Sequence, residues 1–376
     1  MKQPLKVLHV VNRMVLAGAE TMIMNLYETI DRQEVQFDFV VHESQPGSYD
    51  ERIKELGGTI YVMPKYRVFN HRAYCAAWRH FFKTHPEYSI VHGHLRSTAS
   101  LYLAEAKKAG FFTIAHSHST SNGRGLQAMI KGFLQKSIVK YSDILMGCSQ
   151  EAGEWLYGNE AIKEKPFYIL NNGIHLERFQ FNMEKRRNIR NQYSISDNRL
   201  LLGHIGRFDV PKNHHFLVDL ANKLKEEDPK TMFMFVGDGP LKSDIQKKIE
   251  DLGIEENIIT VSEVKNIEDY YSAFDCFLMP SLYEGLPLTL IEAQANGLPC
   301  LVSNRITKDV DQTSLISREV IDKGIQPWSA FILSNIDLRN ESQFDAQSAL
   351  IKAGFDVKQN AQWLESMYQR RFQEEA

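Results

Sequence analysis

Short apolar runs alternate with helix-length segments along this chain of 376 residues, and the alternation begins twice. Runs rich in β-branched and aromatic residues predict strands. In the first half these are residues 6–11, 37–42, 59–63, 90–94, 112–116 and 167–170, and in the second half residues 200–207, 232–236, 258–264 and 276–279. Strands that alternate with helices are typical of parallel sheets covered by helices. The sequence therefore predicts an α/β protein with two Rossmann-like halves.

The chain is longer than one hydrophobic core usually supports, which favours two domains. Its 43% hydrophobic and 24% charged residues are typical of a soluble globular protein. We find neither an N-terminal signal peptide nor an apolar run of about 18 residues. The four cysteines are scattered, without the spacing of metal ligands or of a disulfide framework. We therefore expect a cytoplasmic protein in a reducing compartment.

Charge is distributed unevenly between the two halves. Residues 1–170 contain 20 Lys and Arg against 16 Asp and Glu, a balance of +4, whereas residues 171–376 contain 24 against 31, a balance of −7. The basic half includes two segments, residues 66–83 and 125–142, that mix cations with aromatic or apolar residues. Such segments predict contact with a membrane surface, and core-facing stripes with solvated cations are the alternative. The excess of +4 is too small for a nucleic-acid-binding protein.

The stretch PSLYEGLPLTLIEAQANGLP, residues 280–299, predicts a strand end, a glycine turn and a helix that stops at Gly297. It carries Glu284 in the turn and Glu292 on an otherwise apolar helix. Backbone amides at a helix N-terminus can bind an anion, and a carboxylate on an apolar helix is rarely buried without a partner. The segment is either an ordinary strand–helix unit with two solvated acids or part of a nucleotide site.

This string resembles the E-x7-E signature of retaining glycosyltransferase family 4, with Gly-Leu-Pro inside it and A-x-x-x-G-x-P after it. The branch that it resembles makes exopolysaccharide or capsule. The resemblance implies the GT-B architecture, in which two Rossmann-like domains face each other across a cleft. It places an acceptor-side domain at residues 1–178 and a nucleotide-sugar-binding domain at residues 179–356. A C-terminal helix, residues 357–376, is expected to return to the first domain.

The loop after the first strand contains Gly18 but no G-x-G-x-x-G, so a bound dinucleotide is not expected. In family 4 the corresponding loop is usually Gly-Gly, and here it is Ala17-Gly18. The resemblance implies that Gly18 lets the backbone approach the donor diphosphate, which a Cβ would obstruct. An ordinary turn glycine is the alternative.

Four histidines follow two predicted strands, in the strings IVHGH and IAHSHS. Ligands of parallel sheets gather at the carboxyl ends of the strands. The H-x-H spacing also suits a metal, but no acidic or thiol ligand accompanies it, so no metal site is expected. The resemblance implies that His116 lies close to the transferred sugar, while His118 contacts the acceptor or the donor phosphate. His94 matches a family element that is mostly positional, and the choice between His116 and His118 as the sugar-side histidine stays open.

Two cations, Arg207 and Lys212, flank a strand-to-helix loop in the string GRFDVPKN. Guanidinium and ammonium groups are suitable donors to phosphate oxygens. The resemblance implies that both hold the donor diphosphate, that Glu292 accepts hydrogen bonds from ribose hydroxyls, and that Val264 borders the nucleobase. The transferred sugar is assigned to Glu284 and the residues after it, Gly285, Leu286 and Pro287.

The predicted enzyme moves a sugar from a nucleoside diphosphate sugar, with UDP favoured, to a hydroxyl of a glycan or lipid-linked acceptor. His116, Arg207, Lys212 and Glu284 are the predicted catalytic residues. The resemblance implies a retaining reaction without metal or cofactor, in which the leaving phosphate acts as base. A peripheral position at the inner face of the membrane is expected.

The alternative is a non-catalytic nucleotide- or sugar-binding protein on the same scaffold. Three departures from the family pattern favour it: Ala17, His175 in place of the usual Asp in NNGIH, and a polar, irregular stretch after Val302. The intact cations and carboxylates described above argue against it.

Overall fold

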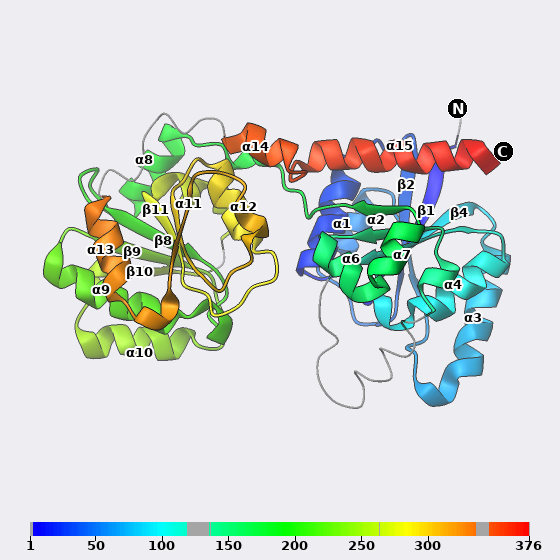
Figure 1. Ribbon diagram of the computed structural model, residues 1–376, viewed down its shortest axis with the longest axis horizontal. Helices are drawn as coiled ribbons and strands as arrows, with labels where there is room; N and C mark the ends of the chain where they lie inside the picture. The colour runs from blue at the N-terminus through cyan, green and yellow to red at the C-terminus, as the bar shows by residue number, and fades with distance from the viewer. Residues whose placement is uncertain (1–2, 119–134, 136, 263, 336–345, 376) are drawn as a thin grey trace. The chain divides into compact units, whose positions relative to one another are not determined.

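The computed structural model describes residues 3–118, 135, 137–262, 264–335 and 346–375, and it divides into two compact units (Figure 1). Unit 1 consists of Met1–Ile174 and Asp356–Ala376, and unit 2 of His175–Phe355. The structure divides the chain after Ile174, four residues before the boundary at residue 178 that the sequence predicts. Each unit contains one parallel sheet covered by helices, so the predicted α/β fold with two Rossmann-like domains is confirmed.

The sheet of unit 1 has seven parallel strands in the order β3-β2-β1-β4-β5-β6-β7. Its strands are β1 (Leu5–Val10), β2 (Val35–Val41), β3 (Ile60–Val62), β4 (Tyr88–Gly93), β5 (Phe112–Ser117), β6 (Ile144–Gly147) and β7 (Phe167–Ile169). The order 3-2-1-4-5-6 is that of a doubly wound nucleotide-binding sheet. Sequence analysis missed β6, a strand of four residues.

Helices cover both faces of this sheet. They are α1 (Gly18–Thr29), α2 (Asp50–Glu55), α3 (His71–Thr84), α4 (Ala99–Lys108), α6 (Gln150–Tyr157), α7 (Asn159–Glu164) and α15 (Val357–Glu375), with the short turns η1 (Val68–Asn70), η2 (Arg96–Thr98) and η3 (Val139–Tyr141). Successive strand residues point to opposite faces. Val7 accordingly packs in one core with α1 and α15, and Leu8 packs in the other with α3 and α4.

The C-terminal helix α15 belongs to unit 1, where it packs against α1 (Figure 1, red). Its buried side chains recur at helical spacing along one stripe. They are Val357, Ala361, Leu364, Met367 and Tyr368. This stripe fixes the helix on the face of the sheet that also carries Val7, which places Tyr368 next to β4.

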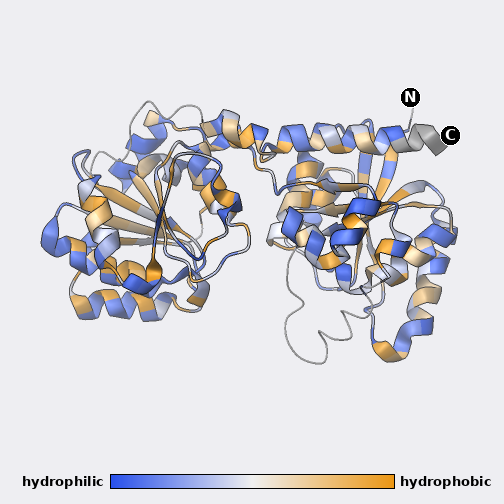
Figure 2. Cartoon of the chain, viewed as in Figure 1, coloured by the Kyte–Doolittle hydropathy of each residue, from blue (hydrophilic) through white to orange (hydrophobic). Residues whose placement is uncertain are grey.

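The sheet of unit 2 has six parallel strands in the order β10-β9-β8-β11-β12-β13. Its strands are β8 (Leu201–Ile205), β9 (Met232–Val236), β10 (Ile258–Val261), β11 (Cys276–Met279), β12 (Cys300–Ser303) and β13 (Ile316–Glu319). Its helices are α8 (Met183–Gln192), α9 (His214–Glu227), α10 (Lys242–Leu252), α11 (Ile267–Ala273), α12 (Leu288–Ala295), α13 (Gln326–Ser334) and α14 (Ala346–Lys352). Figure 2 shows apolar strands inside each unit and polar outer helix faces.

Two polar stretches of unit 2 form regular secondary structure. Residues 182–198, whose composition alone is typical of a linker, contain α8, whose Arg186 and Arg190 bind Asp275 and backbone carbonyls. The irregular stretch after Val302 ends in β13, which pairs with β12. Its residues are polar because the strand lies at the sheet edge and is only half-buried.

Candidate functional site

In unit 2 the loop after β8 and the turn after β11 are joined at the carboxyl ends of two neighbouring strands. Lys212, at the end of η5 (Val210–Lys212), places its Nζ 2.8 Å from Oε1 of Glu284. The Leu282 N–H donates to the Pro211 carbonyl at 2.8 Å, and the Asn213 side chain donates to the Pro280 carbonyl at 3.1 Å. These bonds hold the ion pair in place, and the structure thus brings together two of the predicted site residues.

Arg207 lies on the same loop as Lys212 but is not paired with a carboxylate of the described residues. Its side chain is exposed, and it forms no ion pair with any residue that the structure describes. Lys212 and Glu284, in contrast, are 17% and 13% exposed, so their charges are held close together near the surface. The loop therefore presents one neutralised cation and one cation that is available to an anion.

Glycines shape both sides of this loop. Gly237, after β9, has a φ of +145°, and a Cβ there would lie 2.2 Å from the Gly206 carbonyl oxygen, so the two loops can approach only without a side chain. Gly285 differs, because a Cβ built on it would meet nothing within 4 Å. The space above Gly285 is therefore open, and neither packing nor backbone strain in unit 2 requires a glycine there.

Glu292 projects from α12 and is half-buried. The Tyr271 hydroxyl, on α11, donates a hydrogen bond of 2.6 Å to its Oε2. Burial raises the pKa of this carboxyl to about 7, and the Tyr271 bond opposes that rise. Glu292 therefore has the partner that a buried acid requires, and it changes charge close to neutral pH.

Three buried oxygens on the same loops were not singled out from the sequence. They are Asp209 Oδ1, Ser281 Oγ and Thr289 Oγ1, and none has a hydrogen-bond partner in the described part of unit 2. Buried polar atoms without a partner are unfavourable and mark places where a ligand or water can bind. Thr289 also lies in the first turn of α12, where the Leu290 N–H donates to the Pro287 carbonyl at 3.0 Å. Their signal in the sequence is weak, since isolated hydroxyls beside apolar residues are common.

Three further predicted donor contacts lie at the borders of this region. Leu286 and Pro287 follow Gly285 directly, and Pro287 is the residue before the first turn of α12. Val264 is half-buried and lies after β10, which ends at Val261 and not at residue 264 as predicted.

In unit 1 the chain enters α1 at Gly18, the first residue of the helix. Ala17 before it is extended and provides no side-chain cap, so the first N–H groups of α1 have no partner from that residue. Gly18 is exposed, and the atom nearest to a Cβ built there would be Asn172 Nδ2 at 4.0 Å. The position is open, as the predicted approach of a diphosphate requires, and the fold tolerates a side chain there.

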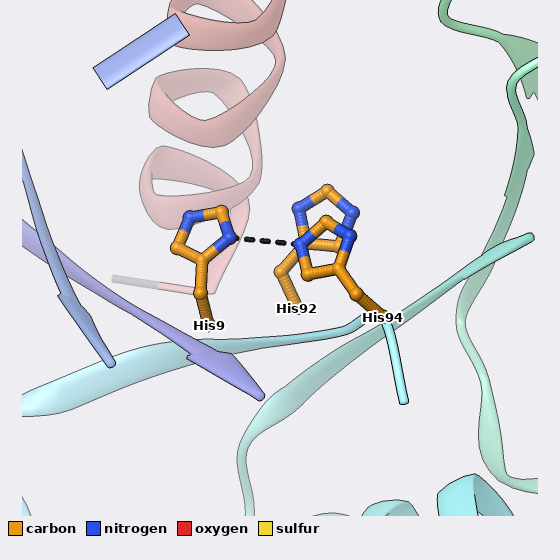
Figure 3. Close-up of side chains that lie close together, drawn as sticks. All are labelled: His9, His92 and His94. Atoms are coloured by element: carbon orange, nitrogen blue, oxygen red, sulfur yellow. Dashed lines mark hydrogen bonds between the residues drawn. The ribbon is translucent and has the colours of Figure 1, made fainter. Parts of the chain in front are cut away.

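Five histidines gather at the carboxyl ends of β1, β4 and β5. His92 and His116 lie on β4 and β5, His94 and His118 follow them, and His9 on β1 joins them. Figure 3 shows three of the five, His9, His92 and His94. His94 is central, since its Nε2 lies 2.9 Å from His9 Nδ1 and its Nδ1 lies 2.8 Å from His118 Nε2. Sequence analysis missed His9, because a single histidine in an apolar strand gives no signal until strand pairing is known.

Burial keeps this cluster uncharged. It lowers the pKa of His9 and of His118 to about 3, and it lowers the pKa values of His92, His94 and His116 well below the ordinary value. His116 is 1% exposed, and neither of its ring nitrogens has a partner among the described residues. The structure thus brings the predicted His94, His116 and His118 into one neutral stack.

The remaining predictions concern surfaces. In residues 66–83 the aromatic residues of α3 are core, whereas Val68 and Phe69 of η1 are 63% and 83% exposed beside the exposed Arg67 and Arg72. The segment 125–142 lies largely outside the described residues. No described helix has the length and apolar character that crossing a membrane requires.

His175 replaces the aspartate that is usual at this position of the family pattern. Its Nδ1 lies 3.6 Å from Glu177 Oε1.

The chain is similar to known glycosyltransferases along most of its length. Residues 16–178 match the family model Glycosyltransferase Family 4, and residues 185–308 match Glycosyl transferases group 1. The chain is 33% identical over 371 residues to the Putative glycosyltransferase EpsF of Bacillus subtilis (strain 168), with 96% of each chain covered. It is 24% identical over 309 residues to the UDP-Gal:alpha-D-GlcNAc-diphosphoundecaprenol alpha-1,3-galactosyltransferase of Escherichia coli, with 80% of this chain and 79% of that protein covered.

Among solved structures, Anabaena Alr3699/HepE in complex with UDP has the same fold, with a TM-score of 0.77 at 16% identity over 97% of this chain and 100% of that chain. Together with the family models and the full-length relative, this likeness confirms the resemblance on which the site was predicted. The chain belongs to glycosyltransferase family 4, a family of retaining enzymes with the GT-B fold.

Proposed function

We propose that this protein transfers a hexose from a UDP-sugar to a hydroxyl of a glycan or lipid-linked acceptor, with retention of configuration, in exopolysaccharide or capsule synthesis. The observation that carries the proposal is the loop that holds Lys212 against Glu284 and leaves Arg207 unpaired. UDP is favoured because HepE was solved with UDP and the Escherichia coli relative is named for UDP-Gal.

The main chemical requirement of this reaction is to stabilise the negative charge that develops on the leaving diphosphate. Arg207 and Lys212 would bind its oxygens and stabilise the charge that develops as the sugar C1–O bond breaks. Two cations can meet this demand without a metal ion. Lys212 would then divide its interactions between the diphosphate and Glu284, which positions the ammonium group and accepts a hydrogen bond from the transferred sugar.

Retention follows if the acceptor attacks from the face that the diphosphate leaves. The acceptor oxygen forms the new bond to C1, and its proton passes to the departing phosphate oxygen, so no covalent enzyme intermediate is formed. Trapping a glycosylated side chain during turnover would contradict this mechanism.

Other residues would bind the rest of the donor. Glu292 would accept hydrogen bonds from the ribose hydroxyls, and Val264 would border the uracil. The open positions Gly18 and Gly285 would let backbone N–H groups approach the diphosphate and the sugar. His116 would lie at the sugar, with His118 and His94 beside it.

The acceptor side concerns unit 1. The Escherichia coli relative is named for a diphosphoundecaprenol acceptor, which is a lipid. Two exposed apolar residues, Val68 and Phe69, lie beside two exposed cations, Arg67 and Arg72. A surface that combines apolar and cationic side chains is attracted to anionic membranes. We infer that this surface, which we call the η1 tip (residues 67–72), binds the inner face of the membrane and keeps the enzyme close to a lipid-linked substrate.

The test is donor binding, measured by calorimetry with UDP-, GDP-, ADP- and CMP-sugars in EDTA. UDP-sugars should bind the wild-type chain, and Arg207→Ala should weaken binding at least about 10-fold, the loss of one charge-assisted bond. Lys223→Ala on α9, which breaks exposed ion pairs with Glu226 and Glu227, is the matched control and should bind like wild type. Binding by another nucleotide class alone would contradict the choice of UDP. Binding without any sugar transfer or donor hydrolysis would favour the non-catalytic alternative.

A further inference from the structure

The histidine stack of unit 1 contains more imidazoles than contact with one sugar requires. Three of them, His9, His92 and His94, form a compact group at the ends of β1 and β4 (Figure 3). We propose that these three histidines bind a divalent transition metal ion of the Zn²⁺, Co²⁺ and Ni²⁺ class. No step of the proposed sugar transfer depends on this ion.

The backbone places the three side chains on one face of the sheet. β1 and β4 are parallel neighbours, and His9 and His92 are paired directly across them. His94 lies two residues beyond His92, and alternation along an extended chain returns it to the same face. The convergence therefore depends on strand register and not on the chance conformation of one long side chain.

The distances suit a metal. One ring nitrogen from each histidine lies within 4.8 Å of those of the other two, and His9 Nδ1 is 2.9 Å from His94 Nε2. Nitrogens on a tetrahedral ion with bonds of about 2.0–2.1 Å lie about 3.3 Å apart. The rings now stack, with centroids 5.2 Å apart for His9–His94 and 4.3 Å for His92–His94. The χ2 torsion of histidine is broad, so rotating the rings can bring their lone pairs to one point.

One candidate ligand nitrogen has no hydrogen-bond partner among the described residues. It is His92 Nε2, which is buried on a side chain that is only 1% exposed. A buried polar atom of this kind requires a partner, and a bound ion is one of the ordinary ones.

Tyr368 on α15 adds the positioning bond that such sites contain. Its hydroxyl oxygen lies 2.6 Å from His92 Nδ1. The tautomer with a proton on Nδ1 donates to Tyr368 and leaves the Nε2 lone pair free. Metal-bound histidines are held by their second nitrogen in this way.

The ligand set selects the kind of ion. It consists of imidazole nitrogens, and no carboxylate or thiol belongs to the group that the described residues form. Mg²⁺ and Ca²⁺ prefer oxygen, whereas imidazole suits Zn²⁺ and its neighbours. Three protein ligands would leave one coordination position open. A second group, His94 with His116 and His118, shares one ligand with the first. We place the ion in the first group because Tyr368 gives His92 a hydrogen-bond partner at Nδ1, whereas neither ring nitrogen of His116 has a partner among the described residues.

The experiment uses the full chain, stripped with a chelator that is then removed. Calorimetry with ZnCl₂ and the visible spectrum with CoCl₂ should show one ion per chain, with the absorption of a low-coordinate cobalt site. His9→Phe should reduce affinity at least about 100-fold, and Tyr368→Phe about 10–100-fold, the usual effect of losing a positioning partner. The exposed His80 and His215 provide matched controls, and His80→Ala and His215→Ala should bind like wild type.

Three results would overturn the proposal. One is the absence of a stoichiometric ion in the wild type, and another is unchanged binding in His9→Phe. The third is loss of the ion in His116→Phe but not in His9→Phe, which would assign it to the second group. His9→Phe is the variant least disruptive to the fold, because it keeps a ring against Phe37, whose centroid is 4.1 Å from that of His9. UDP-sugar binding in EDTA is measured separately, so failure of the metal site leaves the transferase proposal intact.

Discussion

The Lys212–Glu284 pair is the smallest unit on which the account depends. Its two charges come from different loops and are 17% and 13% exposed. A diphosphate that binds Arg207 and Lys212 would add negative charge where one cation is already neutralised. The pair would therefore tune how strongly Lys212 attracts the proposed donor, and removal of either partner should affect turnover more than folding.

Replacing Lys212 with Ala should lower kcat/KM for sugar transfer by about 100- to 1,000-fold, the usual cost of one donor to a developing negative charge. The free energy of unfolding should change by about 1 kcal/mol or less, because both side chains still reach solvent. Steady-state kinetics and urea denaturation measure the two quantities. Lys223→Ala serves again as the matched control. A fall in activity that is matched by loss of folded protein would contradict the assignment.

Gly18 and Gly285 offer a second test, because a Cβ at either position meets no close neighbour within its own unit. Gly18→Ala and Gly285→Ala should leave stability within about 1 kcal/mol of wild type. If the donor approaches these positions, the same changes should weaken UDP-sugar binding about 10-fold or more. Wild-type affinity in both variants would show that neither position faces the donor.

Glu292 should make stability dependent on pH. Burial raises the pKa of its carboxyl to about 7 in the folded chain, above the ordinary value of 4.5 in the unfolded chain. The folded state therefore holds the proton more strongly, and the contribution of Glu292 is present below about pH 4.5 and is lost as pH rises through 7. Glu292→Gln should gain about 1–3 kcal/mol relative to wild type between pH 5 and 8 in urea denaturation. Parallel curves for the two proteins would contradict the raised pKa.

At the scale of elements, strand-to-helix loops carry most of the assigned chemistry. The sequence predicted most strands because their apolar runs are dense, and the resemblance selected Arg207, Lys212, Glu284 and Glu292. It could not predict β13, whose polar residues suit an exposed edge, nor the role of α8. In α8 a buried Arg190 is stabilised by Asp275 and by backbone carbonyls, which are contacts that only the folded chain creates.

The tip formed by η1 gives a prediction at this scale. Val68→Ser combined with Phe69→Ser should reduce sedimentation with vesicles that contain anionic phospholipid, because both side chains are exposed and contribute little to the core. Leu252→Ser, at an exposed apolar residue of α10 in unit 2, is the control. Equal sedimentation of all three proteins, or equal binding to neutral vesicles, would contradict membrane contact at this tip.

At the scale of the molecule, the sequence supplied the α/β class, the two domains and the family, because all three depend on patterns that repeat or extend over many residues. The five-histidine stack was predicted only in part, because IVHGH and IAHSHS reveal four of its members. His9, His92 and Tyr368 are distant in the chain and meet only through strand register and the packing of α15. Contacts that depend on pairing between separate segments, such as those of His9 and Tyr368, leave no local pattern in the sequence.

The central claim is that this family 4 chain transfers a sugar from a UDP-sugar through the cations of unit 2. The most direct measurement is mass-spectrometric detection of a glycosylated acceptor after incubation with UDP-hexoses and undecaprenyl-diphosphate-linked sugars in EDTA, for wild type and Arg207→Ala. We predict a product of one added hexose from the wild type, and at least about 100-fold less from the variant. Equal product from both proteins, or product from GDP-sugars alone, would contradict the account.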